Sequence, residues 1–240
     1  MNASVNLTPL PFEVAAPAWT QLDRAQLKPC WKAAGKLVEQ LSKLGDAGSQ
    51  AVQATIGDAC FVEWDHYPDD DVSDKRHASQ YFYHAHPGLQ RPFSEHGHFH
   101  LFIHAEKLGL ARVRDGRRPA PAHLFAVSMN AQGLPQGLFT VNRWVTKGPW
   151  LAARQVLTAL DQFNIKGREG VPEVNAFLVA LCRLYRPQLV QLLAARDAAL
   201  ATHGAGRDRR TVFADPNIEV LSFCPIDLVA DIEALEALLG

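Results

Sequence analysis

The chain has 240 residues, and its 24 basic and 25 acidic side chains give a net charge of −1. Such a balance supplies no surplus of positive charge to attract nucleic acid or an anionic membrane. Hydrophobic residues make up 48% of the chain, which is ample for a packed core. We therefore expect a globular protein that has neither nucleic acid nor a membrane as a partner.

The four cysteines are far apart in the sequence, and no CxxC pair occurs. This spacing excludes a zinc ribbon and a dithiol redox motif, and it favours reduced thiols. The first basic residue is Arg24, so the charged segment and apolar run of a secretory signal are missing at the N-terminus. We expect a cytoplasmic location.

The N-terminal part of the chain is predicted to be helical after an irregular arm over residues 1–21. Apolar residues recur at helical spacing over residues 22–44, which predicts a helix that ends at Gly45. Pro29 lies inside this segment and is expected to split or restart the helix. A second, short helix is predicted for residues 47–56.

The middle of the chain predicts strands. Segments rich in β-branched and aromatic residues follow one another with polar or Gly- and Pro-containing loops between them, a pattern that favours an antiparallel meander. The predicted strands are residues 59–65, 79–86, 96–104, 123–129 and 138–145.

Helices return after the strands, over residues 149–163 and again from Pro172. Pro187 should break the latter helix, residues 211–223 could add one or two strands, and a final helix should begin near Asp227. The predicted fold class is α+β: a central antiparallel sheet of about five or six strands with helices from both ends of the chain packed on it. We expect a single domain over residues 22–240, with a boundary near residue 148 as the alternative.

Histidine is concentrated in one part of the sequence. Seven of the ten histidines fall in the segment from His77 to His104. Side chains alternate between the two faces of a strand. The histidines of the run EHGHFHLFIHAE are all at even-numbered positions, so they should share one face. Neighbouring rings on that face lie roughly 6.6 Å apart and can lean together onto one ion or one anion. The histidines of this run are His96, His98, His100 and His104.

Two sets of metal ligands are possible on this face. In the first, His98 and His100 combine with His123, a spacing similar to the ligand arrangement of the alpha carbonic anhydrases, although the rest of the chain does not resemble that family. In the second, His84 and His86 on an adjacent strand face His98 and His100, with Glu95 and Glu63 as available carboxylates. The HxH strand partly resembles cupin metalloproteins, but the second half of their motif is missing.

A third interpretation involves no metal. The segment HGHFHLF, residues 96–102, resembles the motif of the histidine triad nucleotide hydrolases and transferases. That resemblance implies that His98 attacks phosphorus. Gly97 departs from the family pattern, in which this position is hydrophobic.

Charged residues outside the histidine run add one candidate. Arg143, predicted to lie on a strand, could hold a carboxylate or phosphate of a substrate, or pair with a nearby aspartate. The acidic run that begins at Asp69 lacks the spacing of a calcium loop and should form a solvated turn, from which Asp71 could orient an imidazole.

Four segments taken together, EWDHYPDDDV, YFYHAH, EHGHFHLF and VNRWVT, resemble an uncharacterised bacterial family of unknown function over roughly residues 55–235. The resemblance implies that these segments belong to one recurring site. It implies no activity, cofactor or substrate.

The leading hypothesis is a metal-binding protein, in particular a metalloenzyme that is either a hydrolase or an oxygen-activating enzyme. Its cofactor would be a divalent metal ion, zinc or iron, its partner a small-molecule substrate, and Glu95 and Arg143 its catalytic residues. The alternatives are phosphotransfer or hydrolysis of nucleotides, and a non-catalytic module that binds small anions or senses pH. The candidate metal ligands are His84, His86, His96, His98, His100 and His123.

Overall fold

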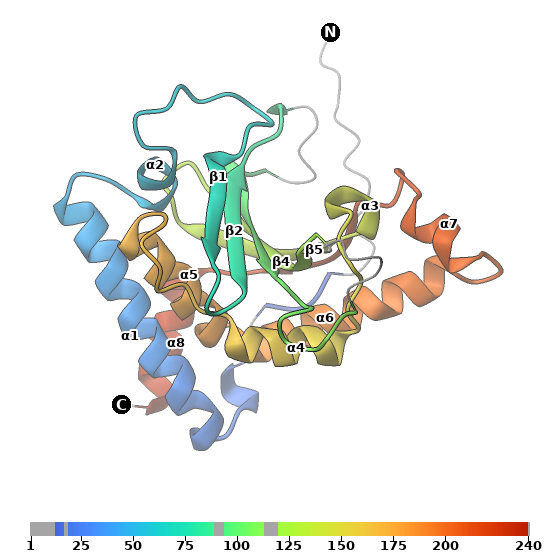
Figure 1. Ribbon diagram of the computed structural model, residues 1–240. Coiled ribbons are helices and arrows are strands. Elements are labelled where there is room, and N and C mark those ends of the chain that lie inside the picture. Colours follow the sequence, from blue (N-terminus) through green and yellow to red (C-terminus); the bar gives the residue numbers. More distant parts are fainter. Residues whose placement is uncertain (1–12, 17–18, 89–93, 113–119, 240) are drawn as a thin grey trace, which may run out of the picture.

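The computed structural model describes residues 13–16, 19–88, 94–112 and 120–239. Its centre is a six-stranded sheet in which every strand pairs antiparallel with its neighbours in the sequence, in the order β1-β2-β3-β4-β5-β6 (Figure 1). The strands are β1 Tyr67–Asp74, β2 Ser79–His84, β3 Gly97–Ile103, β4 Ala122–Met129, β5 Pro135–Val141 and β6 Val220–Pro225. This arrangement confirms the predicted antiparallel meander.

Helices from both ends of the chain accompany the sheet, which confirms the α+β class. The long helices gather below and beside it in Figure 1, and the short helices α3 and α7 lie beyond its far end. The helices are η1 Trp19–Gln21, α1 Arg24–Asp46, α2 Ala51–Ile56, α3 Arg143–Thr146, α4 Ala153–Gln162, α5 Pro172–Leu184, α6 Arg186–His203, α7 Arg209–Phe213 and α8 Leu228–Leu239.

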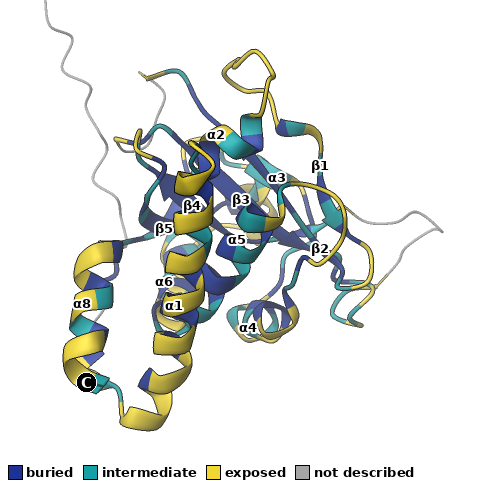
Figure 2. Cartoon of the chain, turned by 90° about the vertical axis from the view of Figure 1, so that its left-hand side faces the viewer, coloured by how far each residue is buried: buried dark blue, intermediate teal, exposed yellow. Residues whose placement is uncertain are grey.

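The two faces of the sheet have different chemistry. Phe99, Leu101 and Ile103 of β3 are fully buried and join the main apolar cluster, which contains residues of α1, α5 and α6. On the neighbouring strand the Tyr81 hydroxyl donates to Asn175 of α5 at 2.7 Å, which places that face toward the helices. The even-numbered residues of β3 therefore point away from the helices. The inner strands are dark blue in Figure 2, while α1 and α8 expose their outer sides.

The start of the sheet differs from the prediction. Residues 59–65 form an irregular loop with a turn, and the acidic segment expected as a solvated turn is strand β1. An edge strand pairs on one side only, so it tolerates solvated charges such as Asp69 and Asp70. Asp74 is buried, and its carboxylate accepts hydrogen bonds from backbone N–H groups of Arg76, His77 and Lys166.

Of three further predicted boundaries, two change and one is confirmed. The helix over residues 24–46 continues through Pro29 without a break. The predicted break at Pro187 is confirmed, because α5 ends at Leu184 and the proline lies in the first turn of α6. Backbone N–H groups in the first turn form no hydrogen bond within the helix, so proline, which has no N–H, is tolerated there. The strand predicted for residues 138–145 ends at Val141, because the Asn142 side chain accepts from the Arg143 N–H and begins α3.

The remaining predictions concern the chain ends. Residues 211–223 provide the end of α7 and the start of a single strand, β6. Most of the predicted N-terminal arm lies outside the described residues, although Glu13 forms a parallel bridge with Phe223. Among the helices that the structure describes, none is long and apolar enough to cross a membrane. The four cysteines are free thiols, of which Cys60 is exposed.

Gly97 at the start of β3 permits the close approach of the neighbouring strand. A Cβ atom at this position would overlap the Tyr83 hydroxyl and the His84 carbonyl oxygen. We therefore expect Gly97→Ala to lower the free energy of unfolding by about 2 kcal/mol, as overpacking does in other cores. Urea denaturation monitored by circular dichroism measures this change.

A matched control is Gly35→Ala in α1, where nothing lies within reach of an added Cβ. Alanine favours a helix interior over glycine, so this variant should gain about 0.5–1 kcal/mol. Equal effects of the two substitutions would contradict the packing argument.

Candidate metal centre

Three buried histidines meet where the end of β2 lies beside the start of β3. His84 and His98 are direct partners in the strand register, and their Nε2 atoms are 2.7 Å apart. His86 follows β2, and its ring centroid lies 4.9 Å from that of His84 and 5.2 Å from that of His98. Each of the three residues offers a ring nitrogen, and these nitrogens all lie within 4.8 Å of one another. We call His84, His86 and His98 the three-histidine cluster.

A carboxylate determines which ring nitrogen of His98 carries the proton. Glu95 Oε1 lies 2.7 Å from His98 Nδ1, and both side chains are buried. An ionised carboxylate only accepts, so Nδ1 carries the proton and the lone pair of His98 is on Nε2, directed toward His84. Carboxylate–histidine pairs of this kind orient imidazole ligands around metal ions.

The distance between the Nε2 atoms of His84 and His98 is that of a hydrogen bond, and it is shorter than the distance expected between two ligands of one metal ion. Without an ion, His84 donates an Nε2–H to the lone pair of His98 across the 2.7 Å separation. With a tetrahedral zinc ion the two nitrogens would lie about 3.3 Å apart, because each Zn–N bond is about 2.0–2.1 Å long. The rings therefore need to separate by roughly half an ångström to accept an ion.

Aromatic rings enclose the cluster. Trp64 stacks on His86 with 4.2 Å between ring centroids, while the rings of Phe139 and Phe82 meet His98 and His84 at right angles. Sequence reasoning did not identify Trp64, which lies in the loop predicted to be a strand and has a positive φ of 74°. Such surroundings exclude water from the inner side of the cluster.

Three imidazoles on this face, those of His84, His100 and His123, have lowered pKa values and are neutral at physiological pH. Burial lowers the pKa of His84 to about 2, and the neighbouring rings of His98 and His86 lower it in the same direction. Burial likewise holds the pKa of His100 well below its ordinary value and lowers that of His123 to about 3. Neutral imidazole is the form that binds metal ions.

His100 and His123 form a second pair beside the cluster. The His100 ring lies 4.7 Å from the His98 ring, and its Nδ1 is 3.0 Å from His123 Nε2. An irregularity in the β3–β4 register, between Leu101 and Phe102, pairs His123 with Phe102. The set His98, His100 and His123 is therefore not the one whose nitrogens converge among the described residues.

His96 points elsewhere. It precedes β3, so the alternation of the strand does not extend to it, and its Nδ1 is 2.6 Å from the Tyr83 hydroxyl. His104 follows the same strand and contacts Gln80 through Nε2 at 3.1 Å. Neither belongs to the three-histidine cluster.

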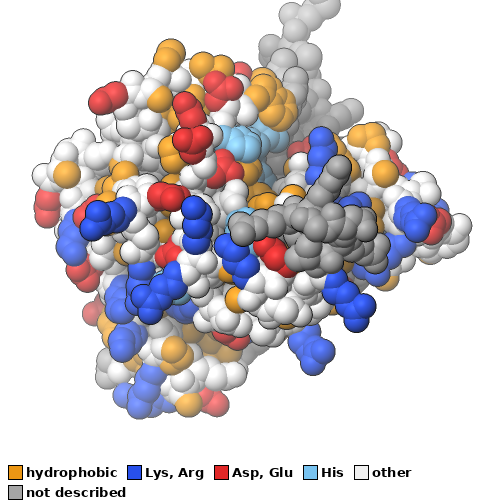
Figure 3. Space-filling view, in the orientation of Figure 1, with side chains coloured by type: hydrophobic (Ala, Val, Ile, Leu, Met, Phe, Trp, Pro, Cys, Tyr) orange, Lys and Arg blue, Asp and Glu red, His pale blue; other side chains and the backbone are white. Residues whose placement is uncertain are grey.

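The other predicted site residues lie around the cluster rather than in it. Arg143 donates from Nε to the Gly148 carbonyl at 3.2 Å and lines a small pocket together with His123. Asp71 contacts His66 Nδ1 at 3.0 Å, and that ring lies 5.8 Å from the His84 ring. Histidine side chains reach the surface at a hollow in Figure 3, next to acidic and apolar side chains.

The fold and the site together define an α+β protein with a buried, carboxylate-supported histidine cluster that could hold a metal ion. The chain belongs to a family described as a domain of unknown function (DUF6969), which matches residues 31–226. This match confirms the resemblance to an uncharacterised family. No curated protein and no solved structure matches the chain.

The lowered histidine pKa values make the metal-free protein sensitive to mild acid. The ordinary pKa of 6.5 applies to the unfolded chain, whereas His84, His100 and His123 titrate far lower in the folded state. Below about pH 6.5 the unfolded chain binds protons that the folded chain does not, so stability falls as the pH falls. Asp74 contributes little to the change in stability between pH 7 and pH 5, because its ordinary pKa of 3.8 lies below that range.

We expect the free energy of unfolding, measured in urea with a chelator present, to fall by at least about 2 kcal/mol between pH 7 and pH 5. His123→Gln keeps a hydrogen-bonding group beside His100 but does not titrate, so its stability should depend less steeply on pH. An unfolding free energy that is equal at the two pH values would show that these rings are not buried in neutral form.

Proposed function

We propose that this protein is a zinc-dependent hydrolase whose metal ion is held by His84, His86 and His98. The observation that carries the proposal is the hydrogen bond of 2.7 Å between Glu95 and His98, which directs a lone pair into a space shared with two other buried imidazoles. Three histidine nitrogens are the ligand set of several catalytic zinc sites, in which the fourth position holds water.

The ligand set favours zinc over iron. Non-haem iron enzymes that activate oxygen use two histidines and one carboxylate on the metal. Here the converging atoms among the described residues are all imidazole nitrogens, and Glu95 contacts His98 instead. Three neutral ligands leave the full charge of the ion to act on bound water, which lowers the pKa of that water to about 7.

Two residues predicted to be catalytic receive more specific roles. Glu95 is buried and bonded to a ligand, so we assign it the orientation of His98 in place of general-base catalysis. Arg143 has no ion-pair partner among the described residues, so its guanidinium is available to anchor an anionic group of a small-molecule substrate.

The same geometry speaks against attack of His98 on phosphorus. Its Nδ1 is occupied by Glu95 and its Nε2 lies 2.7 Å from His84 Nε2. A nucleophilic imidazole needs one nitrogen with open access to the phosphorus atom. A metal ion would need only the Nε2 atoms of His84 and His98, which already face each other, and a small separation of the two rings.

Metal content tests the first part of the proposal. Protein purified without an affinity tag should contain about one zinc ion per chain by elemental analysis. His98→Ala removes a ligand and should abolish stoichiometric binding, while Glu95→Gln should weaken zinc affinity about 10- to 100-fold because the ring loses its orientation.

The matched control is His104→Gln, in the same histidine run but outside the cluster, which should retain the metal. Circular dichroism establishes that the variants are folded. Wild-type protein that contains no metal and takes up none on reconstitution would contradict the proposal.

Hydrolysis of an activated ester tests the second part. The zinc-loaded protein should hydrolyse p-nitrophenyl acetate with a rate that rises with pH through a midpoint near 7, because the bound hydroxide is the nucleophile. The chelated protein and His84→Ala should lose this component. Activity that survives chelation unchanged would show that the metal is structural or that the reaction occurs elsewhere.

A further inference from the structure

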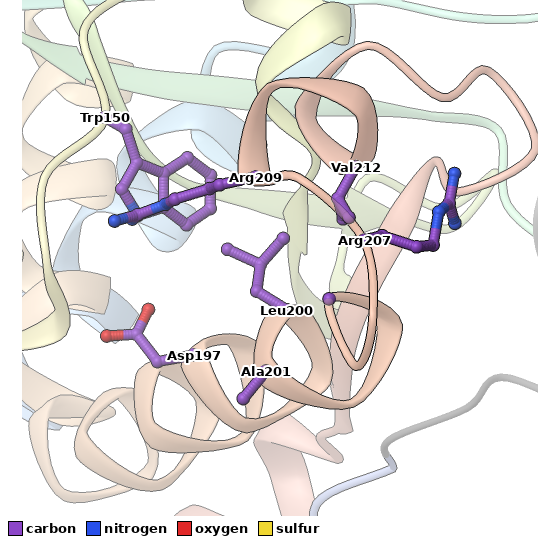
Figure 4. A pocket seen from close by; sticks show the side chains of 8 residues that line it. Trp150, Asp197, Leu200, Ala201, Arg207, Arg209 and Val212 are labelled. Carbon is purple, nitrogen blue, oxygen red and sulfur yellow. The ribbon is translucent and has the colours of Figure 1, made fainter.

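A second cavity lies apart from the three-histidine cluster, between α6, α7 and the loop that carries Trp150. Its volume is about 350 Å³, and Trp150, Leu200, Ala201 and Val212 give it apolar walls. Figure 4 shows these side chains around one hollow. Pockets for small organic molecules have volumes of about 300–1,000 Å³ and combine apolar walls with a few polar groups.

The acidic side chain of the cavity is already neutralised. Asp197 Oδ1 accepts from Arg196 Nε at 2.9 Å and from Arg196 Nη2 at 2.6 Å, and its Oδ2 accepts from the Ala153 N–H at 2.9 Å. Arg196 is buried, while Asp197 is partly exposed. Asp197 therefore contributes no free negative charge to the cavity.

One of the two arginines that line the cavity is neutralised as well. Arg207 pairs with Asp215 at 2.7 Å and turns outward in Figure 4. Arg209 has no carboxylate within ion-pair distance in the part of the chain that the structure describes. Its guanidinium lies 4.9 Å from the centre of the Phe213 ring. The cavity thus holds one uncompensated positive charge.

The second guanidinium near Trp150 belongs to Arg196, which is paired with Asp197. The Arg196 guanidinium lies 4.3 Å from the centre of the Trp150 ring. Burial lowers the pKa of Arg196, and the charge of Arg209 lowers it further, although Asp197 opposes the shift. An anion next to Arg209 would relieve the repulsion between the two guanidinium groups.

We infer that this cavity binds a small organic carboxylate with a flat apolar body. The carboxylate contacts Arg209, and the body packs against Trp150, Leu200 and Val212. Guanidinium recognises carboxylate through paired, charge-assisted hydrogen bonds, and the apolar walls offer contact area to the apolar body of an organic anion. The cavity shares no residue with the three-histidine cluster, so this inference stands independently of the proposed function.

Benzoate and benzamide are suitable probes, because they have the same shape and differ in charge. Isothermal titration calorimetry on the full chain should show that benzoate binds at least about ten times more tightly than benzamide. Arg209→Gln should weaken benzoate binding about ten-fold and leave benzamide binding unchanged. Ala201→Phe fills the cavity and should abolish binding of the two probes.

The matched control is Arg210→Gln, an exposed neighbouring arginine that does not line the cavity and should leave the affinity for benzoate unchanged. His98→Ala should also retain benzoate binding, which separates this test from that of the metal centre. Circular dichroism establishes that each variant is folded.

Three results would overturn the inference. The first is wild-type protein that binds no benzoate up to tens of millimolar. The second is equal affinity for benzoate and benzamide. The third is Arg209→Gln with unchanged affinity for benzoate.

Discussion

The hydrogen bond between the Glu95 carboxylate and His98 Nδ1 is the constraint on which the candidate site depends. It fixes which nitrogen of His98 carries the proton, and it holds the ring while the strand register brings His84 directly opposite. Without it, the two Nε2 atoms would be free to form a neutral hydrogen-bonded pair in either direction. With it, one lone pair always faces the partner ring.

The position of the cluster follows from the different side chains on the two faces of the sheet. The helix side takes up the large apolar side chains of β3, which leaves the opposite face to imidazoles and aromatic rings. Burial among those rings lowers the pKa values of His84 and His100 and keeps these two imidazoles uncharged, so they lie close together without charge repulsion. The same burial lowers the free energy of unfolding of the metal-free protein in acid, because the unfolded chain binds protons that the buried rings do not. An ion bound only by the folded chain would raise the free energy of unfolding.

Contiguous side chains join the cluster to the cavity at Trp150. His98 packs on His100, His100 bonds to His123, and His123 lines a small pocket that Trp150 also lines. Trp150 in turn forms a wall of the larger cavity between α6 and α7. Arginine side chains line both pockets, and the three-histidine cluster lies at the other end of this line of side chains.

The sequence by itself determined the α+β class, the antiparallel order of the strands and the histidine face of β3, because these follow from local periodicity over adjacent residues. It also placed His84 and His86 opposite His98, since consecutive strands of a meander are neighbours.

Only the tertiary structure decided which histidines converge. The alternation starts with β3 at Gly97, and His96 precedes it and contacts Tyr83. The register irregularity beside Phe102 places His123 against His100. The stacking of Trp64 on His86 and the meeting of Trp150 with Arg196 join residues far apart in the chain. No local pattern encodes such contacts, because they depend on loop paths and on how helices pack against the sheet.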